Sequence, residues 1–177
     1  KLGKVENVIA QCINYKTIQL SWDKVENATA YLVERFSGDE WIEIARTSDP
    51  NYTVTGAKTG KVYTYRVKAI KDAEEGAYCD EISEKTTLSG EIELSITSNG
   101  NDQFDLTWNQ VEGATRYIIY RQANDGAWKK VITLGKAATT YTSGKMKPGT
   151  YAYQVKAARY DGSERVNGNA SNVVEGI

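Results

Sequence analysis

The chain has 177 residues, of which 40% are hydrophobic and 25% are charged, and its 22 basic and 23 acidic side chains leave a net charge of −1. This composition is that of a globular protein and excludes a disordered or collagen-like chain. The balanced charge gives no reason to expect nucleic acid or an anionic membrane as partner. No apolar run reaches the about 18 residues that a membrane-spanning helix requires. Histidine is absent, which excludes Ser-His-Asp and Cys-His catalysis and every zinc site that uses imidazole.

The sequence contains an internal repeat. Residues 20–35 (LSWDKVENATAYLVER) are matched 86 positions later by residues 106–121 (LTWNQVEGATRYIIYR), and 8 of the 16 positions are identical. Residues 63–69 (YTYRVKA) are matched by residues 151–157 (YAYQVKA) at an offset of 88. Two copies of about 88 residues therefore fill the chain, and each has the size of a small self-sufficient domain. We predict two domains, residues 1–88 and residues 89–177.

In chain order, apolar and polar residues alternate over residues 18–22, then over 31–33 and 63–69, and in the second copy over 104–108. This period of two is typical of strands with one buried and one solvated face. Turn-forming residues separate the apolar segments at 37–39, 59–60, 99–100, 124–126 and 148–149. No segment of 12 or more residues has clean helical spacing. The sequence therefore predicts an all-β fold of sandwich type.

Three segments of the second copy, residues 106–121, 124–128 and 148–157, together resemble a fibronectin type III domain, of the form common in surface and secreted bacterial proteins. The first copy has the same pattern at Trp22, Tyr31, Trp41, Tyr63 and Val67. Each copy resembles one such domain, and together the two copies cover nearly the whole chain. It implies two tandem immunoglobulin-like sandwiches of seven strands each, with strands A, B and E packed against the remaining four.

The resemblance also implies roles for single aromatic residues. Trp22 and Trp108 become core residues of strand B. Tyr63 and Tyr151 become tyrosine corners at the start of strand F, with each phenol reaching back to a loop carbonyl. Pro148 and Gly149 precede Tyr151, but the first copy has no Pro-Gly pair before Tyr63. The corner hydrogen bond of Tyr63 is therefore not expected to follow that of Tyr151 in detail.

The joint between the copies is short. Strand G of the first copy is expected over residues 82–87, and residues 91–94 are expected to begin the second copy, which leaves only residues 88–90 between them. Such a joint restricts the two domains without fixing their angle, and we expect an elongated pair. The chain begins at Lys1 without an initiator methionine, as a processed chain or a fragment would.

The two cysteines, Cys12 and Cys79, are too few for a disulfide-dense scaffold or a four-cysteine metal site. Cys12 shares the alternation of Val8 and Ala10, which predicts an inward-facing thiol that acts as a small core hydrophobe. The fold implied by the resemblance places Cys79 beside the FG loop, near the opposite end of the sandwich. We therefore expect both cysteines to be unpaired.

Carboxylates and amides offer the candidate sites for chemistry. Neighbouring acids occur at Glu40 and Glu43, at Glu74 and Glu75, and at Asp80 and Glu81. All fall in predicted loops or on solvated faces, so we predict no catalytic residues. The oxygen-rich segments 99–102 and 124–126 lack the spacing of a calcium loop and are interpreted as turns. We predict no cofactor-binding and no metal-binding residues.

Aromatic residues offer the candidate contacts. Trp41 and Trp128 occupy matching positions on the predicted C′ strand, where packing against the sheet edge is favoured over stacking on sugar rings. Four tyrosines near loops or strand ends are the better candidates for partner contact, namely Tyr15, Tyr52, Tyr78 and Tyr160. The resemblance further implies partner loops at residues 24–30, 72–78, 110–116 and 160–168. The Arg-Gly-Asp tripeptide is absent.

The resemblance favours a non-catalytic module of a surface or secreted protein, which acts as a spacer or presents loops to a partner. The alternative is a carbohydrate-binding accessory module of an extracellular polysaccharide-degrading protein. The partner is expected to be a protein or polysaccharide at the cell surface, and the chain a monomer. The first copy has 12 basic and 14 acidic residues and the second has 10 and 9, which is too even to steer a charged partner.

Overall fold

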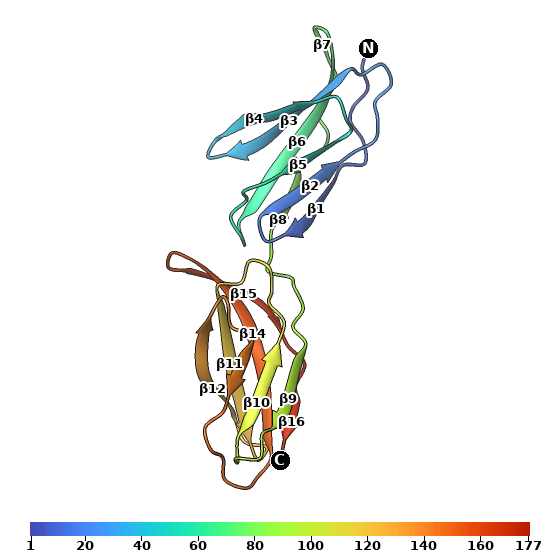
Figure 1. The fold of residues 1–177 in the computed structure, drawn as a ribbon. Helices are drawn as coiled ribbons and strands as arrows, with labels where there is room; N and C mark the ends of the chain where they lie inside the picture. Colours follow the sequence, from blue (N-terminus) through green and yellow to red (C-terminus); the bar gives the residue numbers. More distant parts are fainter. The chain divides into compact units, whose positions relative to one another are not determined.

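The computed structural model describes all 177 residues and contains strands but no helices. Its contacts divide the chain into two compact units, Lys1–Thr87 and Leu88–Ile177. No helix in it is long and apolar enough to cross a membrane. The all-β prediction is confirmed, and each unit is a sandwich of two antiparallel sheets (Figure 1).

The first unit packs a three-stranded sheet against a larger one. The smaller sheet has the order β1 (Ile9–Asn14), β2 (Thr17–Ser21), β5 (Asn51–Val54). The larger sheet has the order β4 (Glu40–Thr47), β3 (Ala30–Ser37), β6 (Val62–Lys71), and β6 also pairs with β7 (Glu74–Glu75) and β8 (Ile82–Lys85). This is the expected ABE sheet against the C′CFG sheet, with β7 as a two-residue addition in the FG turn.

The second unit repeats this arrangement. Its smaller sheet has the order β13 (Thr140–Thr142), β10 (Phe104–Trp108), β9 (Leu94–Ser98). Its larger sheet has the order β12 (Trp128–Gly135), β11 (Arg116–Ala123), β14 (Tyr151–Asp161), β15 (Glu164–Ala170), and β16 (Val174–Gly176) also pairs with β14. Two short strands, β15 and β16, therefore share the edge of β14.

Matching register irregularities confirm that the scaffold is duplicated. The pairing of β3 with β4 slips between Val33 and Glu34, and that of β11 with β12 slips between Ile119 and Tyr120, 86 positions later. A bulge of this kind bends the strand and re-aims the side chains beyond it. Both C–C′ hairpins are therefore bent at equivalent points.

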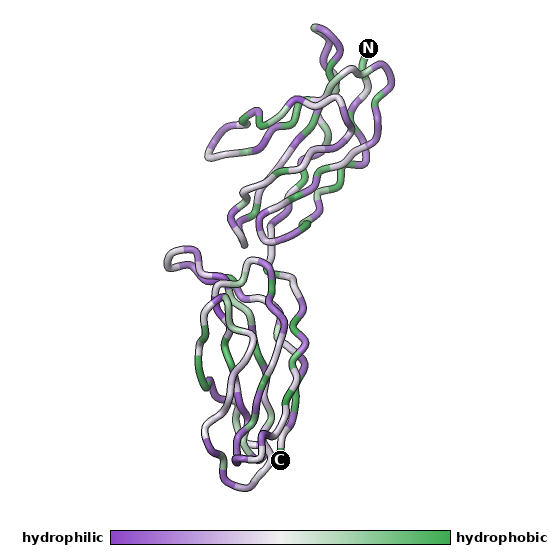
Figure 2. Tube along the Cα trace, viewed as in Figure 1, coloured by the Kyte–Doolittle hydropathy of each residue, from purple (hydrophilic) through white to green (hydrophobic).

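The core follows the predicted alternation, which is visible along the strands in Figure 2. Ile18 and Leu20 of β2 are buried together with Trp22, which directly follows the strand, and so are the matching Phe104, Leu106 and Trp108 of β10. Burying a large apolar side chain stabilises a fold by about 1.5–3 kcal/mol. Each tryptophan packs against a tyrosine of the facing sheet, with ring centroids 5.4 Å apart for Trp22–Tyr31 and 6.0 Å apart for Trp108–Tyr117. The predicted core role of both tryptophans is confirmed.

The two tyrosine corners differ. The Tyr151 phenol donates a hydrogen bond to the Lys147 carbonyl at 2.8 Å, as the resemblance implies. The Tyr63 phenol instead accepts a hydrogen bond from the Lys58 backbone N–H at 2.9 Å. The expected carbonyl contact is therefore wrong for Tyr63. The cause is the loop, because residues 57–62 present a backbone N–H where the loop containing Pro148 presents a carbonyl.

The cysteines are both free thiols, but Cys12 is less buried than the predicted core position requires. Cys12 faces inward at the edge strand β1 and remains half-buried, with its thiol 3.3 Å from the Asn14 carbonyl. Cys79 belongs to the hydrophobic core, where its sulfur accepts a hydrogen bond from the Val67 N–H at 3.2 Å. Burial raises the pKa of the Cys79 thiol.

The joint residues are bonded to the second unit. Leu88 is 2% exposed and packs against Gly168, and the Ser89 carbonyl accepts a hydrogen bond from the Asn169 side chain at 3.0 Å. Regular strand structure ends at Lys85 and resumes at Leu94. The segment expected to be a bare connection is thus partly structured as the entry to the second sandwich.

Candidate binding surfaces

Four of the six neighbouring acids, Glu43, Glu74, Glu75 and Asp80, are bonded to cations. Glu43 accepts from Arg46 at 2.6 Å, Glu75 from Lys68 at 2.7 Å and Asp80 from Lys4 at 2.8 Å. The lysine hydrogen bonds lower the pKa of Glu75 and Asp80, and the N-terminal ammonium lowers the pKa of Glu74. A general acid needs the opposite shift, towards neutral pH. These exposed carboxylates are therefore built as surface ion pairs.

The oxygen-rich segments form turns. The Asn99 side-chain oxygen accepts a hydrogen bond from the Asn101 N–H at 3.0 Å, and that of Asn124 accepts one from the Thr150 N–H at 3.0 Å. Asn124 and Asp125 have positive φ angles of 48° and 58°, which these residue types tolerate better than most. No group of three or more His, Cys, Asp or Glu side chains comes together in the structure.

Of the four candidate tyrosines, only Tyr160 is exposed, at 37%. Tyr15, Tyr52 and Tyr78 are half-buried, and Tyr52 packs against the core of the first unit. The Tyr78 ring lies under the guanidinium of Arg66, 3.8 Å from the ring centroid. Tyr160 is therefore the tyrosine most available to a partner.

The loop expected over residues 160–168 is largely strand. Tyr160 and Asp161 end β14, and β15 begins at Glu164, so only two residues turn the chain. Gly162 has a φ of 65°, which the tight turn requires and glycine adopts without strain. The FG connection of the second unit is therefore a β-ribbon, and it sets Tyr160 directly opposite Arg165.

Trp41 is held in place by its neighbours. The Arg66 guanidinium lies 4.3 Å from its ring centroid, and the Phe36 ring lies 5.3 Å away. Arg66 is itself fixed by an ion pair with Glu34 at 2.6 Å, in which the Glu34 side chain is only 12% exposed. The expectation of packing describes Trp41 well.

Trp128 occupies the same place in the repeat and a different environment. It is 40% exposed, so the expectation of packing is wrong for this residue. The position that matches Arg66 at the offset of 88 is Gln154, which has no guanidinium to cover the indole. Comparing that position between the copies would have revealed the difference from sequence.

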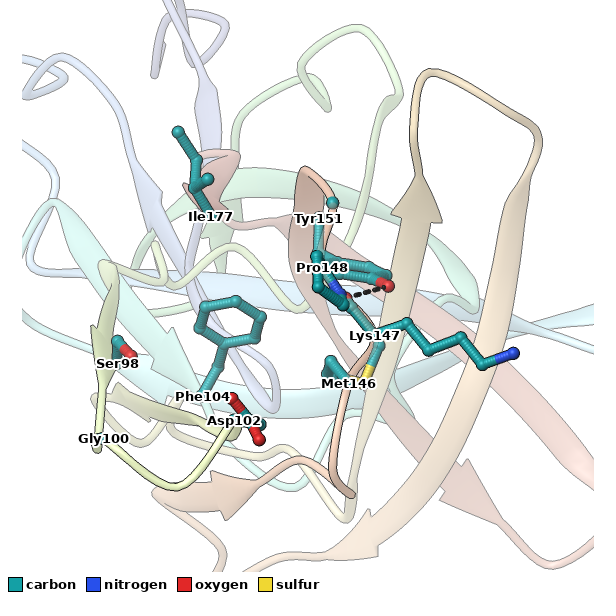
Figure 3. A pocket seen from close by; sticks show the side chains of 10 residues that line it. Ser98, Gly100, Asp102, Phe104, Met146, Lys147, Pro148, Tyr151 and Ile177 are labelled. Atoms are coloured by element: carbon teal, nitrogen blue, oxygen red, sulfur yellow. Dashed lines mark hydrogen bonds between the residues drawn. The ribbon is translucent and has the colours of Figure 1, made fainter.

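Sequence reasoning also missed a pocket of about 310 Å³ in the second unit. Its lining includes Phe104, Met146, Pro148 and Tyr151, with Asp102 and Lys147 as charged residues (Figure 3). The pocket is lined by the loop before β10 and the loop before β14, and only the folded sandwich brings these segments together. Its mixed lining is suited to a small amphipathic group.

Comparisons with known proteins agree with this architecture. Residues 3–85 match the family model for the fibronectin type III domain. Fibronectin type III domain-containing protein 7 of Homo sapiens is 28% identical over 158 residues, which is 88% of this chain and 20% of that protein. An amylopullulanase of Thermoanaerobacterium saccharolyticum is 33% identical over 70 residues, which is 39% of this chain and 6% of that protein. The chain thus spans a fifth or less of these relatives.

A solved structure extends the match over both units. A segment of two fibronectin type III domains from chicken tenascin superimposes with a TM-score of 0.58, at 17% identity and with 97% of each chain covered. The family model covers the first unit, and the repeat carries the same pattern into the second. Residues 3–85 match the fibronectin type III family, and the chain consists of two tandem domains of the fibronectin type III fold.

Proposed function

We propose that the chain is a non-catalytic module of a surface or secreted protein, which spaces a catalytic or adhesive unit and contacts a protein partner. The observation that carries this proposal is the duplicated fibronectin type III fold, because domains of this family are generally non-catalytic. The ion pairs of Glu43, Glu75 and Asp80 support it, since a salt-bridged surface carboxylate is not poised as a general acid. Exposed Tyr160 is the proposed point of contact with the partner.

An immunoblot of the source cells tests this role. Antibody against residues 1–177 is applied to medium, cell-surface and cytosolic fractions, with cytosolic and surface marker proteins as controls. The expected result is a band in the medium or at the surface, far above the 19.6 kDa of this chain. A band confined to the cytosol contradicts the proposal.

We propose as a second candidate a carbohydrate-binding accessory module. Exposed Trp128 favours it, because an accessible indole provides a flat surface on which a sugar ring stacks. The similarity to an amylopullulanase is consistent with this candidate.

Substitution of the two matched tryptophans separates the candidates. For the carbohydrate candidate, Trp128→Ala abolishes retention on a pullulan affinity gel and leaves the melting temperature nearly unchanged. Trp41→Ala is the matched control, and it lowers stability without removing pullulan binding. A wild-type chain that is not retained on pullulan, or a Trp128→Ala variant that is retained like the wild type, refutes the second candidate.

A further inference from the structure

The outer face of the larger sheet in the second domain has a row of cations. Register places Lys130 of β12 opposite Tyr120, which lies opposite Gln154 of β14. Lys156 is two residues further along β14. Beyond it, Ala158 lies opposite Arg116, and Tyr160 lies opposite Arg165. Because directly opposite residues and alternate residues share a face, all four cations lie on the same side of the sheet.

These cations follow the strand direction at even intervals. They occupy the rows of β14 at residues 154, 156, 158 and 160, so successive cations are two residues apart, or about 6.8 Å along the strands. The four strands that hold them are adjacent in the sheet (Figure 1). We call this surface, formed by Arg116, Lys130, Lys156 and Arg165 with Trp128 and Tyr160, the basic face.

The first domain provides an internal comparison, because its matching face is charge-balanced. There Arg46 is paired with Glu43, Arg66 with Glu34, and Lys68 with Glu75. In the second domain, the positions that match Glu34 and Glu43 are Tyr120 and Lys130. Where the first domain has two acids, the second therefore has an aromatic residue and a cation.

Three cations of the basic face contact neutral groups. Arg116 donates to the Thr115 carbonyl at 2.8 Å, and Arg165 donates to the Asn167 side chain at 2.6 Å. The Lys156 ammonium lies 5.1 Å from the Tyr120 ring centroid. Since a guanidinium has five N–H donors, most donors on the two arginines remain available to an anion.

Acids lie only towards the two ends of the basic face. Glu175 of β16 is opposite Ala152 at one end, and Asp161 and Glu164 form the tip of the β14–β15 ribbon at the other. The small net charge of the second domain therefore hides an uneven distribution. A cationic strip lies between these acids.

The exposed apolar groups of the basic face are aromatic. Trp128 is 40% exposed and Tyr160 is 37% exposed, whereas the one large aliphatic residue of the face, Ile118, is buried at 2%. A protein partner of ordinary size needs an apolar interface core and tends to avoid lysine. Aromatic rings beside cations instead suit a ligand that has both flat rings and negative charges.

We infer that the basic face binds a linear anionic polysaccharide, with sugar rings on the aromatic side chains and carboxylate or sulfate groups on the cations. This inference goes beyond the proposed spacer role. It shares Trp128 with the carbohydrate candidate but requires a charged glycan, so pullulan binding and acidic-glycan binding can fail independently.

The test measures binding of the full chain to polygalacturonate by isothermal titration calorimetry at low and high salt. Lys130→Glu restores the acid found at the matching position of the first domain, and it is expected to weaken binding about tenfold. The matched control is Lys129→Glu, the neighbouring exposed lysine whose side chain points to the opposite side of β12. This control is expected to bind within about twofold of the wild type, because its charge change is the same but lies off the face.

Further outcomes decide the ligand class. Binding that weakens with salt, absence of binding to neutral dextran, and loss of affinity in Trp128→Ala support the inference. Equal effects of the Lys129 and Lys130 substitutions, or no polygalacturonate binding by the wild type, overturn it. Tighter binding to poly-L-glutamate than to polygalacturonate also overturns it, in favour of an acidic protein segment. Circular dichroism and thermal melting confirm that each variant is folded.

Discussion

At the scale of single residues, the Arg66 side chain contacts three others, those of Trp41, Tyr78 and Glu34. Its guanidinium lies between the rings of Trp41 and Tyr78, at 4.3 and 3.8 Å, and forms an ion pair with Glu34. Arg66→Gln introduces the residue found at the matching position of the second domain. We expect a loss of about 2 kcal/mol in the free energy of unfolding, because Glu34 is left largely buried without its cation.

Denaturant unfolding measures this loss, and tryptophan fluorescence follows the exposure of Trp41. Arg46→Gln is the control, because its ion pair with Glu43 is exposed and contributes little. Equal losses in the two variants would contradict the role given to Arg66.

From the burial of Tyr65 we predict how the free energy of unfolding depends on pH in the alkaline range. Its side chain is fully buried, its hydroxyl has no hydrogen-bond partner, and burial raises its pKa to about 12. In the unfolded chain this phenol ionises near pH 10, so the stabilisation is present below pH 10 and is lost as the pH rises towards 12. The free energy of unfolding should fall by about 2–3 kcal/mol over that window.

Tyr65→Phe isolates this contribution. The variant should lack that part of the alkaline loss, and at pH 7 it should be as stable as the wild type or more so, because a buried hydroxyl without a partner is removed. Urea unfolding at pH 7 and pH 11 measures both effects. An unchanged alkaline loss in the variant would show that other groups cause it.

At the scale of elements, the short strand β16 depends on close approach to the core. A Cβ atom at Gly176 would lie 2.4 Å from the Phe104 ring, whereas one at Gly135, at the end of β12, would meet nothing within 4 Å. Gly176→Ala should therefore destabilise the second domain by about 1–3 kcal/mol, and Gly135→Ala should change stability little. Thermal melting of both variants measures the difference, and equal melting temperatures would contradict this packing.

The elements that repeat local patterns could be predicted from sequence, and those that depend on tertiary context could not. Alternation located β2, β6 and β10, because one face of each is buried in the core. The burial of Cys79 could not be predicted, because it depends on packing beside the distant Val67, whose N–H donates to the Cys79 sulfur, rather than on the alternation of a strand. The alternation of β12 does not indicate the exposure of Trp128, although a comparison of Arg66 with Gln154 between the copies does. The pocket beside Phe104 requires two loops far apart in sequence.

At the scale of the whole molecule, duplication gives two sandwiches with one scaffold and different surfaces. Matching residues build the cores, as Trp22 and Trp108 do with their tyrosine partners. The outer faces differ, because ion pairs cover that of the first domain and exposed cations with aromatic rings occupy that of the second. The scaffold is thus shared, while the outer faces of the two domains differ.

The central claim is that the chain consists of two self-sufficient domains, and we propose residues 1–88 and 89–177 as their boundaries. The most direct measurement compares the ¹⁵N–¹H spectra and the calorimetric unfolding of each half, expressed alone, with those of the full chain, and Leu88 is kept in the second half because it is buried there. We predict that each half unfolds cooperatively and that its spectrum superimposes on the corresponding signals of the full chain, except near residue 88. An unfolded half, or shifts throughout its core, would contradict the claim.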